Sequence, residues 1–431
     1  MFVSVAGDKN DINQLVDHLY RHEAGKLVAV LTRVFGSDNL ELAEDVVHDS
    51  LIEAIKSWPY KGLPEDPSAW LYKVAKNKTL NILNKEKYKK HHAPEIAQTL
   101  NYEWATISAT DQLFSEHQIA DDQLRMIFTA CHPSLSKDSQ VALTLKTLCG
   151  FSIPEIAHAF FTTDDTINKR LVRARQKIRE AKIPFEVPFE EMEGRLEAVL
   201  ETIYLVFNEG YSASSGEEII RYELCEEAIR LAEMLATHPG IERKSNVFAI
   251  LALMLLNASR FASRIDKDGN IFTLAEQNRG LWNPGLMQKG FAYLERSTAE
   301  SSISIYHILA TISAYHCAAP DFVSTDWQGI LKMYDHLLEL DRSPLVKLNR
   351  SVPLSKVSGV EKAIEELEQL KNDPSFSSYH LLYATEAEFY LESKQYAKAV
   401  EAFQKAIDHS PLDAEKKLLQ KKLKLCQEKF T

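Results

Sequence analysis

The sequence has few cysteines and no long apolar run, and both absences exclude classes of protein. Its 5 cysteines are scattered over 431 residues without a C-x-x-C pair, which argues against a disulfide framework or a thiolate zinc site. The longest apolar run, from Val247 to Leu256, is about half of the ~20 residues that a membrane-spanning helix needs, so we expect a buried helix there. The opening MFVSVAGDKN lacks a basic segment followed by an apolar one. We therefore expect a cytoplasmic protein with reduced thiols and no membrane contact.

Alternating apolar and polar residues are also scarce. No convincing period-2 run bounded by turn residues occurs, and nearly every segment has helical periodicity, so the predicted fold class is all-α. Side chains of catalytic or metal-binding type occur only as pairs without a third partner at fixed spacing. These pairs are His91 with His92, Cys131 with His132, and His307 with His316. We therefore expect no enzyme and no cofactor or metal.

Charge is distributed unevenly along the chain. Of the formal net charge of -11, residues 1–182 contribute -1 and residues 183–431 contribute -10. Two basic patches lie within the near-neutral N-terminal part, from Lys73 to Lys90 and from Lys169 to Lys182. A polyanion could bind at either patch despite the sign of the whole chain.

Helical periodicity in residues 1–90 predicts three helices. The first covers residues 11–34 and is closed by GSDN. The second, from Leu40 to Trp58, has an apolar stripe on one side and turns Asp45, His48, Asp49 and Glu53 outward. After the loop PYKGLPEDP, the third begins with Ser68 as a plausible N-cap and ends in basic residues that suit the helix dipole.

The segment GFSIPEIAHAFFTTDDTINKRLVRAR predicts a helix-turn-helix. It follows residues 91–120, which are polar and weakly periodic and are interpreted as a linker. Gly150 ends one helix, Ser152 caps the next with Glu155 three residues later, and Thr163 caps a third, basic helix. An isolated basic run is more often a solvated helix face. The caps, the tight turn and an apolar stripe at residues 167, 171, 174 and 178 favour DNA binding instead.

These two units, in this order, resemble an extracytoplasmic-function sigma factor, a promoter-recognition subunit of bacterial RNA polymerase. LAEDVVHDSLIEAIKSW is similar to the region 2 helix that docks on the polymerase clamp, and AWLYKVAKNKTLNIL to the helix that reads the melted downstream element. SIPEIAHAFFTTDDTINKRLVRARQKIRE is similar to region 4, whose second helix enters the major groove of the upstream element. The resemblance covers roughly residues 10–182. It implies region 2 at residues 1–90 and region 4 at residues 121–182.

The resemblance implies three sets of contact residues. Those for core polymerase are Asp45, Val46, His48, Asp49, Ile52 and Glu53. Those for the downstream element are Tyr60, Lys61, Trp70, Lys73, Lys76, Asn77, Lys78, Asn81 and Lys85. Those for the upstream element are Thr163, Thr166, Asn168, Lys169, Arg170, Arg173, Arg175 and Lys177.

The residue chemistry suits these roles independently. A flipped base needs a pocket built from a loop, so Tyr60 and Lys61 in the predicted loop are the best base contacts, whereas Trp58 and Trp70 lie at apolar-stripe positions more typical of a core. Asn pairs well with adenine and Arg with guanine, while Lys177 suits phosphate. Three departures weaken the pattern. Asn81 and Asn84 replace the family's usual Asp and Arg, and Phe161 occupies the turn where Gly is usual.

The remaining residues predict a helical extension at residues 190–290 and a repeat array at residues 291–431. The break at Glu209–Gly210 is explained by a helix C-cap with Gly210 in the left-handed region. YATEAEFYLESKQYAKAVEAFQKAIDHSP is close to a tetratricopeptide repeat, with Glu386 in place of the usual Leu. The second helix of this repeat contains Ala399. Ala363, 36 residues earlier, and Ile330, 33 residues before that, occupy the same position in two similar segments upstream. This part resembles the extension of a sigma subgroup that carries such repeats behind region 4, which implies regulation by the extension.

The predicted function is therefore a sigma factor with core RNA polymerase and promoter DNA as partners, and with a protein or peptide as a possible partner of the repeats. The acidic extension could cover the basic patches until a signal displaces it, or it could be required for activity by bracing region 4. The alternative function is a helix-turn-helix regulator or repeat scaffold that never joins polymerase. The acidic outward face from Asp45 to Asp49 favours the sigma factor, because polymerase docking needs charge complementarity there.

Overall fold

The computed structural model describes residues 9–89, 116–160, 162–185, 187, 189–212, 220–267, 269–299, 303–372 and 379–430. All regular elements in these ranges are helices, apart from one isolated bridge between Ile265 and Ile271, so the predicted all-α class is confirmed. The chain divides into two compact units. The first comprises residues 1–205 and 237–242, and the second comprises residues 206–236 and 243–431.

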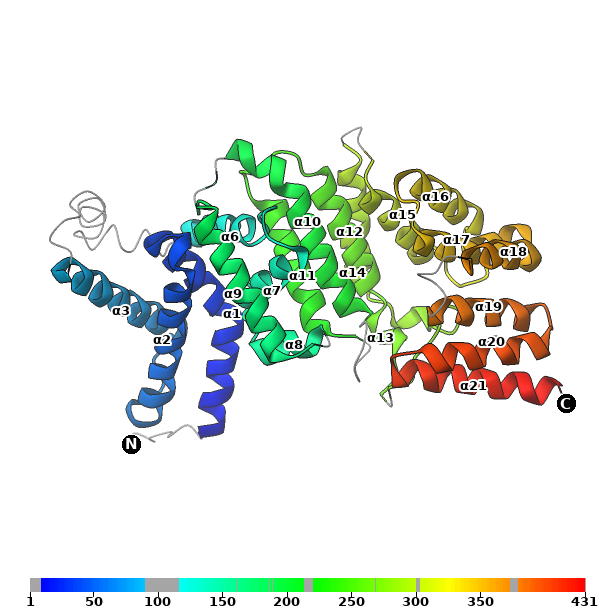
Figure 1. Cartoon of the computed structure of the whole chain (residues 1–431), viewed down its shortest axis with the longest axis horizontal. Coiled ribbons are helices and arrows are strands. Elements are labelled where there is room, and N and C mark those ends of the chain that lie inside the picture. Colours follow the sequence, from blue (N-terminus) through cyan, green and yellow to red (C-terminus); the bar gives the residue numbers. More distant parts are fainter. Residues whose placement is uncertain are drawn as a thin grey trace. The chain divides into compact units, whose positions relative to one another are not determined.

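The first unit begins with three long helices, shown in blue in Figure 1. They are α1 (Lys9–Phe35), α2 (Leu40–Lys61) and α3 (Pro67–Lys89), with a short 3-10 turn at Ser37–Asn39. The predicted boundaries differ at two places. Helix α2 continues through Pro59 and ends at Lys61, where Gly62, with a φ of 80°, caps it. Helix α3 is capped by Asp66, which accepts a bond from the Ala69 amide at 2.9 Å, and not by Ser68 as predicted.

Four shorter helices and most of a long one complete the first unit. They are α6 (Glu116–Ala130), α7 (Lys137–Thr147), α8 (Ile153–Ala159), α9 (Asp164–Glu180) and α10 (Phe189–Tyr211), whose residues up to Leu205 belong to this unit. The predicted linker ends earlier than expected, because α6 begins at Glu116. Met192, Val199 and Leu200 of α10 are almost fully buried, and the Thr202 hydroxyl bonds Gln140 of α7 at 3.3 Å. Helix α10 is therefore part of the core that supports α7.

The second unit continues with α11 (Tyr222–Thr237), α12 (Ser245–Ala258), α13 (Phe261–Arg264) and α14 (Pro284–Ser297). Helix α12 contains the run Val247–Leu256 and is buried along its length, as predicted. The predicted C-cap at Gly210 is wrong, because α10 runs through this residue to Tyr211. A Cβ at Gly210 would lie 2.7 Å from Cys225 Sγ and 2.9 Å from the Arg221 carbonyl oxygen. The glycine therefore lets α11 approach α10 closely.

The rest of the second unit is a succession of helices in which each packs on the next, drawn from yellow to red in Figure 1. They are α15 (Ile305–Ala318), α16 (Trp327–Leu340), α17 (Pro344–Ser358), α18 (Val360–Leu370), α19 (His380–Glu392), α20 (Tyr396–His409) and α21 (Asp413–Phe430). Ile330, Ala363 and Ala399 are buried at matching places in α16, α18 and α20. In the part of the chain that the structure describes, no helix combines the length and apolarity needed to cross a membrane.

Candidate nucleic-acid and partner-binding surfaces

Helices α8 and α9 form the predicted helix-turn-helix, and local hydrogen bonds fix both of their starts. Ser152 and Glu155 form a complete capping box on α8. The Thr163 hydroxyl accepts the Thr166 amide at 3.2 Å, and the dipole of α9 favours Asp164 and the following aspartate in its first turn. The side chains of the predicted apolar stripe of α9 are each at most 1% exposed. The opposite face of this helix is consequently turned to solvent.

The exposed face of α9 carries some of the predicted DNA contacts free of ion pairs. Asn168, Arg173 and Lys177 are exposed, and no described acidic side chain forms an ion pair with either of these cations. Lys169 is exposed too and lies 2.6 Å from Asp165 in the same helix. Arg170 is half-buried, with its guanidinium 2.7 Å from the carboxylate of Asp138. Phe161, where the family pattern has Gly, lies outside the described residues.

Helix α2 presents an acidic surface that matches most of the predicted docking set. Asp45, His48, Asp49 and Glu53 are exposed and Ile52 is half-buried. Val46 is 3% exposed and packs inward, because it lies on the apolar stripe of the helix. Val46 is thus removed from the predicted contact surface and supports the helix from inside.

The predicted downstream-element residues fall into two groups. Tyr60 and Lys61 are exposed, but they lie in the last turn of α2 and not in a loop, since the helix continues past Pro59 to Lys61. Tyr60 is 87% exposed. Trp58 is buried, as its apolar-stripe position predicts, and Trp70 is half-buried and packs edge-on against it, with 5.2 Å between ring centroids.

Helix α3 places the remaining cationic and amide residues along one segment. Lys73, Asn77 and Asn81 are exposed, and Lys76 and Lys78 are half-buried, whereas the side chains from residue 83 to 89, including Lys85, lie outside the described set. Lys73 and Lys76 line an open cleft of about 810 Å³ with residues of α1 and α6. Tyr72, also in this cleft, bonds the Glu23 carboxylate at 3.0 Å, and burial together with this carboxylate raises the pKa of its hydroxyl. The cleft therefore carries both signs of charge, with lysines on α1 and α3 and the carboxylates of Glu23 and Asp66 in its lining.

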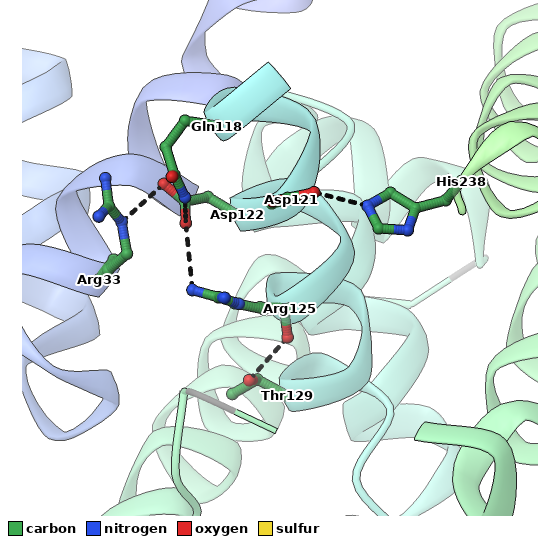
Figure 2. A network of polar contacts seen from close by, with 7 residues as sticks. All are labelled: Arg33, Gln118, Asp121, Asp122, Arg125, Thr129 and His238. Carbon is green, nitrogen blue, oxygen red and sulfur yellow. Dashed lines mark hydrogen bonds and ion pairs between the residues drawn. The ribbon is translucent and has the colours of Figure 1, made fainter. Parts of the chain in front are cut away.

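A buried polar network joins helix α1 to helix α6 (Figure 2). The Arg33 Nε lies 2.9 Å from Asp122 Oδ2, and Arg125 is 3.8 Å from the other carboxylate oxygen. The Asp122 side chain is fully buried. Burial raises the pKa of Asp122 to about 6, even though both arginines and a bond from Gln118 oppose this shift.

The segment between α11 and α12 also contacts α6, through His238 and Asp121. His238 is 6% exposed, and its Nε2 lies 2.7 Å from Asp121 Oδ1, as Figure 2 shows. The Gly240 amide donates to His238 Nδ1 at 3.0 Å. The helix-turn-helix is thus supported by residues far beyond the end of the predicted region 4.

A second set of ion pairs connects α9 with α2. Arg175 pairs with Glu44 and lies 3.9 Å from Glu41, while Arg179 lies 3.6 Å from Glu41. Arg175 is therefore half-buried, although the sequence predicts it as a DNA contact. Burial raises the pKa of Glu44, and the charges of Arg175 and of a nearby lysine oppose this shift. The contacts of Arg175 with Glu44, Arg33 with Asp122 and His238 with Asp121 have no signal in the sequence, because the partners are more than 80 residues apart.

The cysteines and histidines singled out in the sequence have packing and helix-end roles in the described residues. All five cysteines are buried and free, and no group of three or more His, Cys, Asp or Glu residues in the described ranges could hold a metal ion. His132 follows the end of α6, where its Nδ1 accepts the Ser134 amide, and His307 bonds Ser304, the N-cap residue of its own helix. His91 and His92 lie outside the described residues.

Comparison with known proteins places two family models on the first unit. Sigma-70 region 2 matches residues 19–88, and Sigma-70, region 4 matches residues 125–178. A family of unknown function matches residues 195–298. No solved structure matches the chain.

Curated relatives include proteins of two kinds. An uncharacterized protein of Rhizobium meliloti (strain 1021) is 36% identical over 77% of this chain and 78% of its own length. ECF RNA polymerase sigma-E factors of Haemophilus influenzae and Escherichia coli (strain K12) are each 28% identical over 40% of this chain, which covers 87% and 86% of their lengths.

Proposed function

We propose that this chain, which belongs to the sigma-70 family as a factor of the extracytoplasmic-function type, binds core RNA polymerase through α2 and promoter DNA through α3 and α9. The observation that carries the proposal is the pairing of two surfaces in one unit. Asp45 and Asp49 extend from α2 as an acidic face, and α9 exposes Asn168, Arg173 and Lys177 beyond a capped turn. The proposal places the chain in the cytoplasm, where polymerase and promoters are.

The acidic face suits a protein partner with a basic surface. Complementary charge raises the rate of encounter and fixes the orientation of the two partners. The exposed half of α9 suits duplex DNA, because an amide and a guanidinium can read base edges while a lysine binds phosphate. The two surfaces together favour a protein that joins polymerase over one that binds DNA alone.

Co-elution with bacterial core RNA polymerase in gel filtration tests the proposal. We expect the wild-type chain to co-elute and a variant with Asp45→Lys and Asp49→Lys to elute separately. A variant with Glu361→Lys and Glu365→Lys on α18 makes the same change in net charge at exposed positions and should still co-elute. Absence of co-elution of the wild-type chain, with DNA binding retained, would favour the regulator that does not join polymerase.

We further propose that the helices from α15 to α21 are a tetratricopeptide-like array that regulates the sigma factor by binding a protein or peptide. The support is the recurring helix pair and an open groove of about 420 Å³ within the second unit. Aromatic side chains of Trp327, Tyr334 and Phe389 line this groove, and exposed Asn349 offers an amide to a peptide backbone.

Promoter-directed transcription in cells tests the role of the groove. Asn349→Ala removes an exposed amide from the groove and should change transcription without changing thermal stability. Lys332→Ala alters an exposed residue of α16 that does not line the groove and should leave transcription unchanged. Equal transcription from both variants and the wild type would count against a regulatory groove.

A further inference from the structure

The part of the chain that follows region 4 is acidic but ends in a basic helix. Residues 183–431 carry a formal net charge of -10. Residues 413–430, which form α21, carry six lysines against three acidic residues, or +3. Helix α21 packs on α20 and is drawn in red in Figure 1. Such a local reversal of sign is typical of a surface that binds an anionic partner.

Helical spacing divides α21 into a buried face and a charged face. Leu419 is 7% exposed and Cys426 is fully buried, and both belong to an apolar cluster with residues of α20. Lys417, Lys421 and Lys424 recur at positions i, i+4 and i+7, and all three are exposed. Because this spacing places side chains on one side of a helix, the three lysines form a single surface, here called the α21 lysine face.

The lysines of the α21 lysine face form no ion pair with any described residue, in contrast to two other lysines of the same helix. Lys416 lies 3.7 Å from Asp413, one turn earlier. Lys422 pairs with Glu388 of α19, so its charge is neutralised within the fold. The ammonium groups of the face are therefore free to bind an anion from outside.

Two acidic residues lie near the face without pairing with it. Glu276 interacts electrostatically with Lys421, but its carboxylate is hydrogen-bonded to the amide and hydroxyl groups of Thr273. Glu428 is exposed on α21, one turn beyond Lys424. These carboxylates lower the positive potential at the two ends of the face and leave its three cations accessible.

The composition and length of the face suit phosphate groups better than a protein surface. Protein–protein interfaces are enriched in aromatic side chains, Met and Arg and are depleted in Lys. The face consists of lysines, with exposed Gln420 beside them. Lysine ammonium groups are compact charges that bind phosphate without reading sequence. At 1.5 Å per residue, Lys417 and Lys424 are about 10 Å apart along the helix axis, which is the length of about three phosphates of one DNA strand.

We propose that the α21 lysine face binds the phosphate backbone of promoter DNA outside the two elements that regions 2 and 4 read. This inference rests on the proposed sigma function, because regions 2 and 4 bring the chain to the promoter. A tethered surface reaches an effective concentration of about a millimolar. This exceeds the dissociation constants of about 10⁻⁴–10⁻⁶ M that are typical of non-specific DNA binding. A contact too weak to form alone is therefore populated once the promoter is bound, and it adds affinity for DNA of any sequence.

Salt dependence of promoter binding tests the charge contact. The probe is a duplex with flanking DNA on both sides, selected from a random library by the complex of the full-length chain with core polymerase. A variant with Lys417→Gln, Lys421→Gln and Lys424→Gln should lower the slope of log affinity against log salt by about 2.7, or about 0.9 per lysine, and weaken binding about ten- to a hundredfold at about 0.1 M salt. The control variant makes the same change in net charge at exposed positions of α16, α17 and α18, with Lys332→Gln, Lys347→Gln and Lys362→Gln, and should keep the wild-type slope. Equal slopes for the two variants would overturn the DNA contact.

Photocrosslinking identifies what the face touches. The photoreactive residue p-benzoylphenylalanine in place of exposed Gln420 should crosslink to the duplex in the complex with polymerase, and the three lysine changes should remove this crosslink. The same residue in place of exposed Glu365 on α18 should give no crosslink to DNA. Crosslinks to a polymerase subunit alone, or none in a complex that protects the promoter in footprinting, would overturn the DNA contact while leaving the sigma function intact. Failure of the wild-type complex to protect any promoter would overturn both.

Discussion

The Nε2 atom of His238 lies 2.7 Å from Oδ1 of Asp121, a residue 117 positions earlier in the chain. Because the Gly240 amide donates to Nδ1, the proton of the neutral ring is on Nε2 and is donated to the carboxylate. The segment that follows α11 is thus hydrogen-bonded to α6, the first helix of region 4. The extension consequently contributes to the stability of the sigma module.

Replacing His238 with alanine should destabilise α6. The variant leaves the Asp121 carboxylate without this bond, and we expect a loss of about 1–3 kcal/mol in the local free energy of unfolding. Hydrogen exchange of α6 measures this loss. His336→Ala, at an exposed position on α16, is the control and should leave the exchange unchanged.

Truncation after Lys182 should have a larger effect. The shortened chain lacks α10, whose buried Met192, Val199 and Leu200 belong to the core of the first unit, and also lacks His238. We expect region 4 in this chain to unfold without a cooperative transition, as measured by circular dichroism. A sharp transition like that of the full chain would show that region 4 folds without the extension.

The buried Asp122 should make stability depend on pH. Its pKa is raised to about 6 in the folded chain, above the unfolded value near 3.8, so the folded state binds more protons between these values. The free energy of unfolding should therefore fall as pH rises from about 4 to 6, by up to about 3 kcal/mol, and stay level above that window. Urea unfolding at several pH values measures the slope. Asp122→Asn should flatten it, and an equal slope in this variant would assign the dependence to other groups.

Two residues of α9 should affect DNA binding differently. Lys177→Ala should weaken binding to all sequences and lower the salt dependence by about one counterion, as expected for a phosphate contact. Arg173→Ala should cost about 1–3 kcal/mol on the cognate promoter alone, as expected for a base contact. Fluorescence anisotropy over a salt series with cognate and scrambled duplexes measures both. Equal losses on both duplexes for Arg173→Ala would make it a phosphate contact.

Replacing two aromatic residues of α2 should have opposite effects: one change impairs promoter melting, and the other lowers stability. Tyr60 is 87% exposed, so Tyr60→Ala should leave thermal stability almost unchanged and impair promoter melting, detected by permanganate footprinting. Trp58 is buried against Trp70, and Trp58→Ala should cost about 3–5 kcal/mol of stability. Normal melting by Tyr60→Ala would remove this residue from the DNA surface.

Glu386, which stands where the proposed tetratricopeptide-like repeat would have leucine, is buried with a cationic partner. Its Oε1 lies 2.5 Å from Lys371 Nζ, and Tyr390 lies nearby with its pKa raised to about 12, mainly by burial and then by this carboxylate. Lys371→Met should therefore destabilise α18 and α19 by about 3–5 kcal/mol, because it leaves a buried charge unpaired. Adding Glu386→Leu should recover most of the loss. Hydrogen exchange measures both, with exposed Lys362→Met as the control.

Features that depend on neighbours three or four residues away were predictable from the sequence alone. The capping box at Ser152 and Glu155, the cap at Thr163 and the buried stripe of α9 all follow from helix geometry. The all-α class follows from the same periodicity. The prediction at Gly210 was wrong, because the sequence carries no signal of the helix that packs there. The glycine lies within the last turn of α10, and the close approach of Cys225 leaves no room for a side chain.

Only the tertiary structure decided which charges meet. Arg175 has the sequence signature of a DNA contact, yet it lies against Glu44 of another helix. Asp122 and Arg33, and Asp121 and His238, are likewise brought together by packing. The sequence by itself determined the helices and their exposed or buried faces, because backbone bonds and side-chain periodicity are local. The pairing of distant charges depends on which buried faces pack together, and a pattern of period 3.6 carries no information about that choice.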